Sequence, residues 1–129
     1  MAMTFSELTV EERINLNKKI EIIIGTKESW VQEGMDTSQR IEARFAYDKL
    51  KEKLQKVFLK YGDKALAMNF MDYGGYKKGI TPGGKRWVLD MNSGWTARSR
   101  HCGSLYIEGQ GNIFTSGTLA KAFEYIMNN

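Results

Sequence analysis

The distribution of glycine divides this chain of 129 residues into two parts that require different secondary structure. Ten of the 13 glycines lie between Gly74 and Gly117, and Pro82, the single proline, lies there too. Both residue types disfavour helix interiors and are typical of tight turns, so this part is predicted to consist of short strands joined by turns. Residues 1–62 contain few glycines and are predicted to be helical.

The first predicted helix begins at Thr9. Thr9 and Glu12 match a capping box, in which the hydroxyl and the carboxylate each satisfy a backbone N–H group at the start of the helix. Apolar side chains then recur at intervals of three and four residues from Leu16 to Ile24, which is the spacing of one helix face.

A second helix is predicted from about residue 38 to residue 61. Its apolar residues follow alternating steps of four and three and form one seam: Ala43, Tyr47, Leu50, Leu54, Val57 and Tyr61. Asp36 or Thr37 caps this helix, and Gly62 ends it. Two amphipathic helices joined by a short loop are antiparallel neighbours, so residues 1–62 are predicted to form a helical hairpin.

Alternating apolar and polar residues predict strands in the second part. Lys85–Met91 and Trp95–His101 both alternate, and Asn92–Gly94 between them is a turn sequence, so the two runs predict a β-hairpin. Tyr73–Lys78 is predicted to be an exposed loop, because it carries two glycines and four polar or aromatic side chains. Ala65–Met71 fits a short helix or a strand, and the pattern leaves both open.

Further along the chain, Ser104–Glu108 and Ile113–Thr115 predict two more strands, and Thr118 caps a C-terminal helix. The predicted fold class is therefore α+β. The N-terminal antiparallel helical hairpin is followed by a small antiparallel sheet of three or four strands, and the C-terminal helix packs on that sheet. Neither half is large enough to fold comfortably alone, so residues 1–129 are predicted to form a single domain, with residues 63–129 as its sheet half.

Composition excludes several classes of protein. The single cysteine excludes a disulfide framework, and one histidine with one cysteine cannot supply a structural zinc site built from those residues, so neither a metal nor a cofactor is expected. No apolar run approaches the roughly 18 residues that a membrane span requires. The N-terminus lacks the basic and apolar segments of a secretion signal, and a cytoplasmic location is expected.

Positive charge is concentrated in the second part of the chain. The formal net charge is +4, yet the segment from Lys77 to Cys102 contains six basic side chains and a single acidic one, Asp90. A local positive potential of this kind attracts phosphate groups or acidic partner surfaces. The alternative is that the solvent face of a sheet must be polar and is basic here without a ligand.

The first candidate site is the solvent face of the predicted hairpin. With a three-residue turn, Arg86 would pair with Arg100, and Val88 with Arg98, so that the three arginines share one face. That face would also carry Asp90 and Thr96, with Trp87, Leu89, Met91, Trp95 and Ala97 on the core side. Guanidinium groups suit phosphate oxygens and repel one another without an anion. The alternative is that Arg86 or Arg98 pairs with Asp90 and the rest are solvated.

The second candidate site is the loop from Tyr73 to Lys78. Its two tyrosines, Tyr73 and Tyr76, stand next to Lys77 and Lys78 on a glycine scaffold, and such an arrangement can stack on bases and bind phosphate. The alternative is a loop that only connects its neighbours.

A third candidate is a stripe of lysines on the second helix: Lys49, Lys53, Lys56 and Lys60. These positions lie close together on a helical wheel, beside the apolar seam, and could contact the backbone of a polyanion. The alternative is a solvated face whose lysine stems cover the edge of the seam, with some of the charges balanced by Glu52.

The sequence therefore predicts a small non-catalytic protein that binds a phosphate-bearing ligand, either nucleic acid or a nucleotide-type small molecule. The predicted phosphate ligands are Lys77, Lys78, Lys85, Arg86, Arg98 and Arg100; the stacking residues are Tyr73, Tyr76, Trp95 and Tyr106; the supporting polar residues are Asp90, Thr96 and His101. A second hypothesis is a protein–protein interaction module that uses the helical hairpin and the Arg-rich face, with possible self-association through the helices. An enzyme ranks third, because His101 and Cys102 are adjacent on a predicted strand and point to opposite faces.

Overall fold

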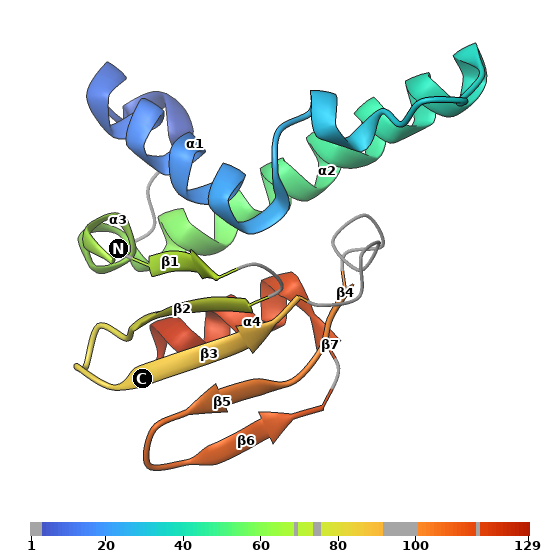
Figure 1. The fold of residues 1–129 in the computed structure, drawn as a ribbon. Helices are drawn as coiled ribbons and strands as arrows, with labels where there is room; N and C mark the ends of the chain where they lie inside the picture. Colours follow the sequence, from blue (N-terminus) through green and yellow to red (C-terminus); the bar gives the residue numbers. More distant parts are fainter. Residues whose placement is uncertain (1–3, 69, 74–75, 92–100, 116) are drawn as a thin grey trace.

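Helices come first along the chain, strands follow, and a last helix comes after them, which confirms the predicted α+β class (Figure 1). The computed structural model describes residues 4–68, 70–73, 76–91, 101–115 and 117–129. Its helices are α1 (Val10–Ile24), α2 (Thr37–Tyr61), α3 (Asp63–Ala67) and α4 (Leu119–Met127), with 3₁₀ turns at Phe5–Glu7 and Glu28–Trp30. Its strands are β1 (Phe70–Tyr73), β2 (Tyr76–Ile80), β3 (Arg86–Asp90), β4 (His101–Cys102), β5 (Leu105–Ile107), β6 (Gly111–Phe114) and β7 (Gly117–Thr118).

Side-chain caps fix where the long helices begin. The Thr9 hydroxyl accepts a hydrogen bond from the backbone N–H of Glu12 (3.1 Å), and the Glu12 carboxylate accepts one from the N–H of Thr9 (2.9 Å). At α2, the Asp36 carboxylate accepts from the N–H of Gln39 at 2.8 Å. Gly62 ends α2 with a φ of +60°, a conformation that favours glycine. The predicted cap at Thr9 and the predicted stop at Gly62 are confirmed.

Two aromatic side chains hold the connection between α1 and α2. The indole N–H of Trp30 donates to the carbonyl of Ile24 at 2.7 Å, and the Tyr47 hydroxyl donates to the carbonyl of Gly25 at 2.9 Å. The two rings meet edge to face, with 5.3 Å between their centroids. These contacts satisfy the carbonyls at the end of α1 and hold α1 beside α2, the next helix along the chain.

Five strands form one antiparallel sheet in the order β1-β2-β3-β5-β6, and β4 pairs with β7 in a separate ladder. The predicted hairpin of Lys85–Met91 with Trp95–His101 is wrong. Both edges of β3 are occupied, by β2 on one side and by β5 on the other. The β5 pairing aligns Leu105 and Ile107 with Leu89 and Trp87 on the buried face.

The prediction of an exposed loop over Tyr73–Lys78 is also wrong, because Phe70–Tyr73 and Tyr76–Ile80 pair as β1 and β2. Glycine and lysine have low strand propensity, but the cross-strand pairing of β2 with both β1 and β3 overrides it. The sheet thus gains β2 where the sequence indicated a loop, and β1 begins at Phe70, within the segment Ala65–Met71 that the pattern left open between helix and strand. Residues 95–100, with the other half of the predicted hairpin, lie outside the described part of the chain.

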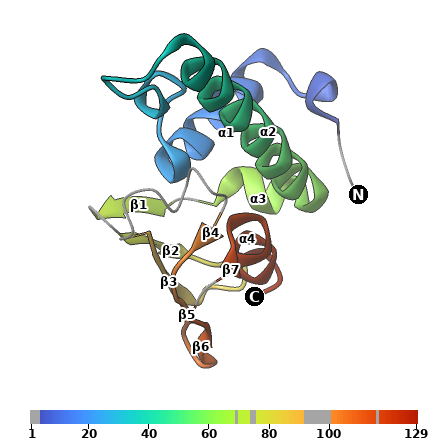
Figure 2. The ribbon, with the colours of Figure 1, turned by 90° about the vertical axis from the view of Figure 1, so that its right-hand side faces the viewer.

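Helix α4 packs on one face of the sheet, as predicted, and α2 packs on α4 (Figure 2). The buried ring of Phe123 on α4 lies 5.7 Å from Trp87 of β3 and 5.7 Å from Phe58 of α2, measured between ring centroids. All three side chains are fully buried. One hydrophobic core therefore contains side chains from the helical half and from the sheet half. No helix in the described part of the chain has both the length and the apolar character needed to cross a membrane.

Truncating this junction should destabilise the whole molecule. Phe123→Ala removes a buried ring from between two others, and we expect it to lower the free energy of unfolding by about 3–5 kcal/mol in urea titrations. The matched variant Tyr125→Ala, on the same helix but 38% exposed, should cost far less. Equal losses for the two variants would contradict the central position of Phe123.

The single thiol should be inert in the folded protein. Cys102 is buried, and this burial raises the pKa of its thiol to about 11 from 9.0. Because the folded pKa exceeds the unfolded one, this contribution to stability is complete below about pH 9 and is lost as the pH rises through 11. We expect Cys102→Ala to flatten the fall in stability over that interval, and wild-type Cys102 to react with a thiol reagent only on unfolding. Rapid labelling of the native protein would contradict the burial.

Candidate functional site

The outer face of the sheet, opposite α4, is not covered by a helix in the described part of the chain (Figure 2). The strand register aligns one residue from each of the five strands in a row across this face: Met71, Lys78, Val88, Tyr106 and Asn112. Met71, Lys78, Tyr106 and Asn112 are exposed and Val88 is half-buried. On the three middle strands the neighbouring side chains are buried on the other face: Lys77, Trp87, Leu89, Leu105 and Ile107. The row therefore belongs to the outer face.

Two shorter rows flank this central row. On one side, Ile80 pairs with Arg86, and the backbone N–H of Glu108 donates to the carbonyl of Arg86 at 2.8 Å. On the other side, Tyr76 pairs with Asp90. The outer face therefore combines exposed apolar side chains with charged groups at both ends of β3.

A hollow of about 650 Å³ lies over the centre of this face. It is lined by Met71, Lys78, Gly79, Ile80, Arg86, Trp87, Val88 and Tyr106. Apolar atoms make up most of its floor, and its two cationic side chains come from β2 and β3. A hollow of this kind suits a ligand with a flat apolar body and an anionic group.

Arg86 forms an ion pair with Glu108 at the edge of the hollow. Its guanidinium Nη2 lies 3.0 Å from Glu108 Oε2, and its backbone N–H donates to Glu108 Oε1 at 3.1 Å. The backbone and side-chain hydrogen bonds from Arg86 hold the pKa of the Glu108 carboxyl below its ordinary value, and Glu108 raises the pKa of Arg86. Both groups are therefore charged at neutral pH. Arg86 thus pairs with Glu108, whereas the alternative interpretation of the sequence paired it with Asp90.

Three of the predicted site residues come together in the hollow: Lys78, Arg86 and Tyr106. Tyr76 and Asp90 lie on the same face in the neighbouring row. The prediction that Arg86 and Asp90 share the face opposite Trp87 and Leu89 agrees with this arrangement.

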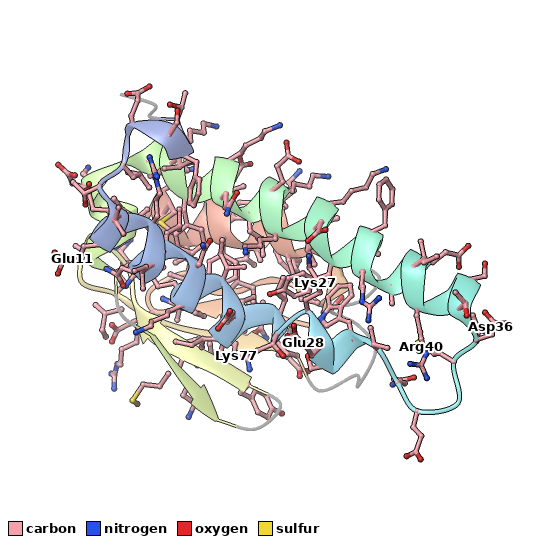
Figure 3. All side chains as sticks on the ribbon, turned by 90° about the horizontal axis from the view of Figure 1, so that it is seen from above. Glu11, Lys27, Glu28, Asp36, Arg40 and Lys77 are labelled. Atoms are coloured by element: carbon pink, nitrogen blue, oxygen red, sulfur yellow. The ribbon has the colours of Figure 1, made fainter. Side chains whose placement is uncertain are left out.

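Two other predicted phosphate ligands lie elsewhere. Lys77 is only 7% exposed and belongs to the covered face of β2, below the helices, rather than to the outer face (Figure 3). The strand alternation explains this correction, since Lys77 and Lys78 must point to opposite faces. Lys85 donates a hydrogen bond to the side-chain oxygen of Asn129 at 3.4 Å and does not line the hollow.

Several predicted site residues cannot be placed. Trp95, Thr96, Arg98 and Arg100 lie outside the described residues, and so do the side chains of Tyr73 and His101. The backbone of Tyr73 ends β1 and that of His101 begins β4, opposite Thr118.

The lysine stripe on α2 already has acidic partners at two of its four positions. Lys56 lies 3.4 Å from Glu52, and Lys60 lies 3.5 Å from Glu124 of α4. The ammonium of Lys49 stands 4.8 Å from the ring centroid of Phe45, and Lys53 is exposed. These contacts support the alternative interpretation, a solvated helix face with partly balanced charge.

The sequence prediction missed three residues that line the hollow, Met71, Ile80 and Val88, and it also missed Glu108, which pairs with Arg86. The alternation Tyr76-x-Lys78-x-Ile80 was a signal for the side chain of Ile80, once β2 is recognised as a strand. Glu108 carries no such signal, because its contact with Arg86 depends on the pairing of β3 with β5.

Among the described residues, no group of three or more His, Cys, Asp or Glu side chains is placed to hold a metal ion. Comparisons of the chain with family models, curated proteins and solved structures gave no match.

Proposed function

We propose that this protein is a non-catalytic binding protein whose outer sheet face binds a nucleotide, either free or within a single strand of nucleic acid. One observation carries the proposal: Tyr106, Lys78 and Arg86 line one hollow on an uncovered sheet. A nucleotide combines a flat aromatic base with a phosphate, and the hollow offers partners for both parts.

Tyr106 supplies the surface for the base. Its side chain is 41% exposed on β5 and lies beside Val88 in the central row. An exposed aromatic ring on a rigid sheet can stack with any base, since every base presents a π-face. Met71 and Ile80 extend the apolar floor toward β1 and β2.

Lys78 and Arg86 supply the positive charge for the phosphate. Both line the hollow, on neighbouring antiparallel strands. A guanidinium has five N–H donors in a fixed plane, and the contact with Glu108 Oε2 uses Nη2, so donors directed away from Glu108 can bind phosphate oxygens. Contacts of this kind bind the backbone of a strand without reading its sequence.

Direct titration tests the proposal, with a short oligothymidylate and with thymidine monophosphate as ligands. Tyr106→Ala should lower the affinity about 5- to 150-fold, because one stacked base contributes about 1–3 kcal/mol. Lys78→Ala should weaken binding and reduce the slope of log affinity against log salt by about 1. Calorimetry or fluorescence anisotropy gives both quantities.

Two variants on α4 serve as matched controls on the other side of the sheet. Tyr125→Ala removes an equally exposed tyrosine, and Lys121→Ala removes an exposed lysine. Both should bind as the wild type does. If the oligothymidylate binds and thymidine monophosphate does not, the ligand is a nucleic-acid strand. If both bind equally well per nucleotide, the ligand is a free nucleotide. No binding of either ligand, or equal losses in the controls, would overturn the proposal.

Glu108 should act as an internal competitor for Arg86. Glu108→Gln removes the negative charge while its amide oxygen can still accept the hydrogen bond from the backbone N–H of Arg86. We expect up to about fivefold tighter nucleotide binding, since an exposed ion pair contributes little net energy. Weaker binding would mean that Glu108 itself contacts the ligand. The same titration measures this change.

A further inference from the structure

The first half of α2 extends beyond the sheet and α4 and presents apolar side chains to solvent (Figure 1). Asp36 and Arg40 mark its far end in Figure 3. Ile41 and Phe45 are both 61% exposed, four residues apart, on the side of α2 opposite its buried seam. Adjacent apolar side chains on an open helix face are the typical anchors of helix-mediated recognition.

The same side of α2 carries a groove near the other end of the helix. The groove has a volume of about 430 Å³ and lies between α2 and the 3₁₀ turn at Phe5–Glu7. Phe5 and Leu59 provide its apolar part, and Lys56 and Lys60 line its edge. One face of one helix thus holds two exposed apolar anchors and, about four turns away, an apolar groove.

An antiparallel second copy of α2 brings these two features together twice. In the register that sets Phe45 of one copy beside Lys56 of the other, Ile41 reaches the end of the groove near Leu59. Two-fold symmetry makes the same contacts in the opposite direction, as in any isologous interface. The anchors of each copy then fill the groove of the other.

The charges between anchor and groove are complementary in this register. Lys49 of each copy comes beside Glu52 of the other, and Asp48 comes beside Lys53. In the single chain, Lys49 stands over the ring of Phe45, and Glu52 pairs with Lys56. Asp48 pairs with Lys27 at 2.8 Å, and its side chain is still 56% exposed, so a second cation can reach it. Opposite charges placed between antiparallel helices specify the register and the partner.

We infer that this face of α2 is a self-association surface, and that its occupant is the same face of a second copy. The inference is independent of the proposed nucleotide site, because none of the residues of the hollow lies on α2.

Sedimentation equilibrium over micromolar to millimolar protein concentrations tests this inference. The wild type should show a reversible monomer–dimer equilibrium. Phe45→Glu should lower the association constant of the dimer at least about 30-fold, because this aromatic anchor fills a pocket at both ends of the interface. Ile41→Glu should act in the same direction. Both positions are exposed, so far-UV circular dichroism should be unchanged.

A charge exchange tests the register. Lys49→Glu alone and Glu52→Lys alone each place like charges opposite one another and should weaken the dimer, whereas the double variant should regain most of the affinity. Val10→Glu, at an apolar position of α1 that is 69% exposed, is the matched control and should not change dimerisation. A monomer at all concentrations, a dimer insensitive to Phe45→Glu, or two single charge variants whose losses simply add would overturn the inference.

Discussion

The ring of Phe123 joins the two halves of this chain. The helical hairpin exposes an apolar seam on α2 and the sheet exposes an apolar inner face, and neither half can bury its surface alone. Helix α4 covers both apolar surfaces, since Phe123 contacts Phe58 of α2 and Trp87 of β3 at the same centroid distance of 5.7 Å. The C-terminal helix is the last element along the chain, and it therefore completes the hydrophobic core of the N-terminal helices.

A consequence of this arrangement is that, among the residues that the structure describes, the helices cover only one face of the sheet (Figure 2). An antiparallel sheet with one solvated face normally carries polar residues there. Here Met71, Ile80 and Tyr106 are exposed on that face and surround the half-buried Val88. Exposed apolar area on a rigid sheet does not stabilise the fold, and its concentration next to two cationic side chains is the physical basis for assigning a ligand to this face.

Local signals predicted the elements better than their pairing. Capping is decided within four residues, so Thr9 and Thr118 could be identified from the sequence, and both caps are present. For α2 the sequence offered Asp36 or Thr37, and Asp36 is the cap. Strand pairing is decided by contacts far apart in sequence, and nothing local indicates that β3 pairs with β2 and β5. Successive side chains along a strand point to opposite faces of the sheet. Lys77 and Lys78 were both predicted to bind phosphate, but as neighbours on β2 they lie on opposite faces.

The outer sheet face and the exposed side of α2 share no residue. Dimerisation through α2 can therefore affect nucleotide binding only by bringing two sheet faces into one assembly. The proposed two-fold pairing of α2 would give a dimer with two sheet faces. If the ligand is a free nucleotide, as one form of the proposed function holds, it would bind each face independently, and its affinity would not depend on self-association. A strand long enough to span both faces meets the second at a high effective concentration after binding the first. Self-association can therefore convert a weak site for a single nucleotide into a stronger site for a polymer, without any change in the residues that contact the ligand.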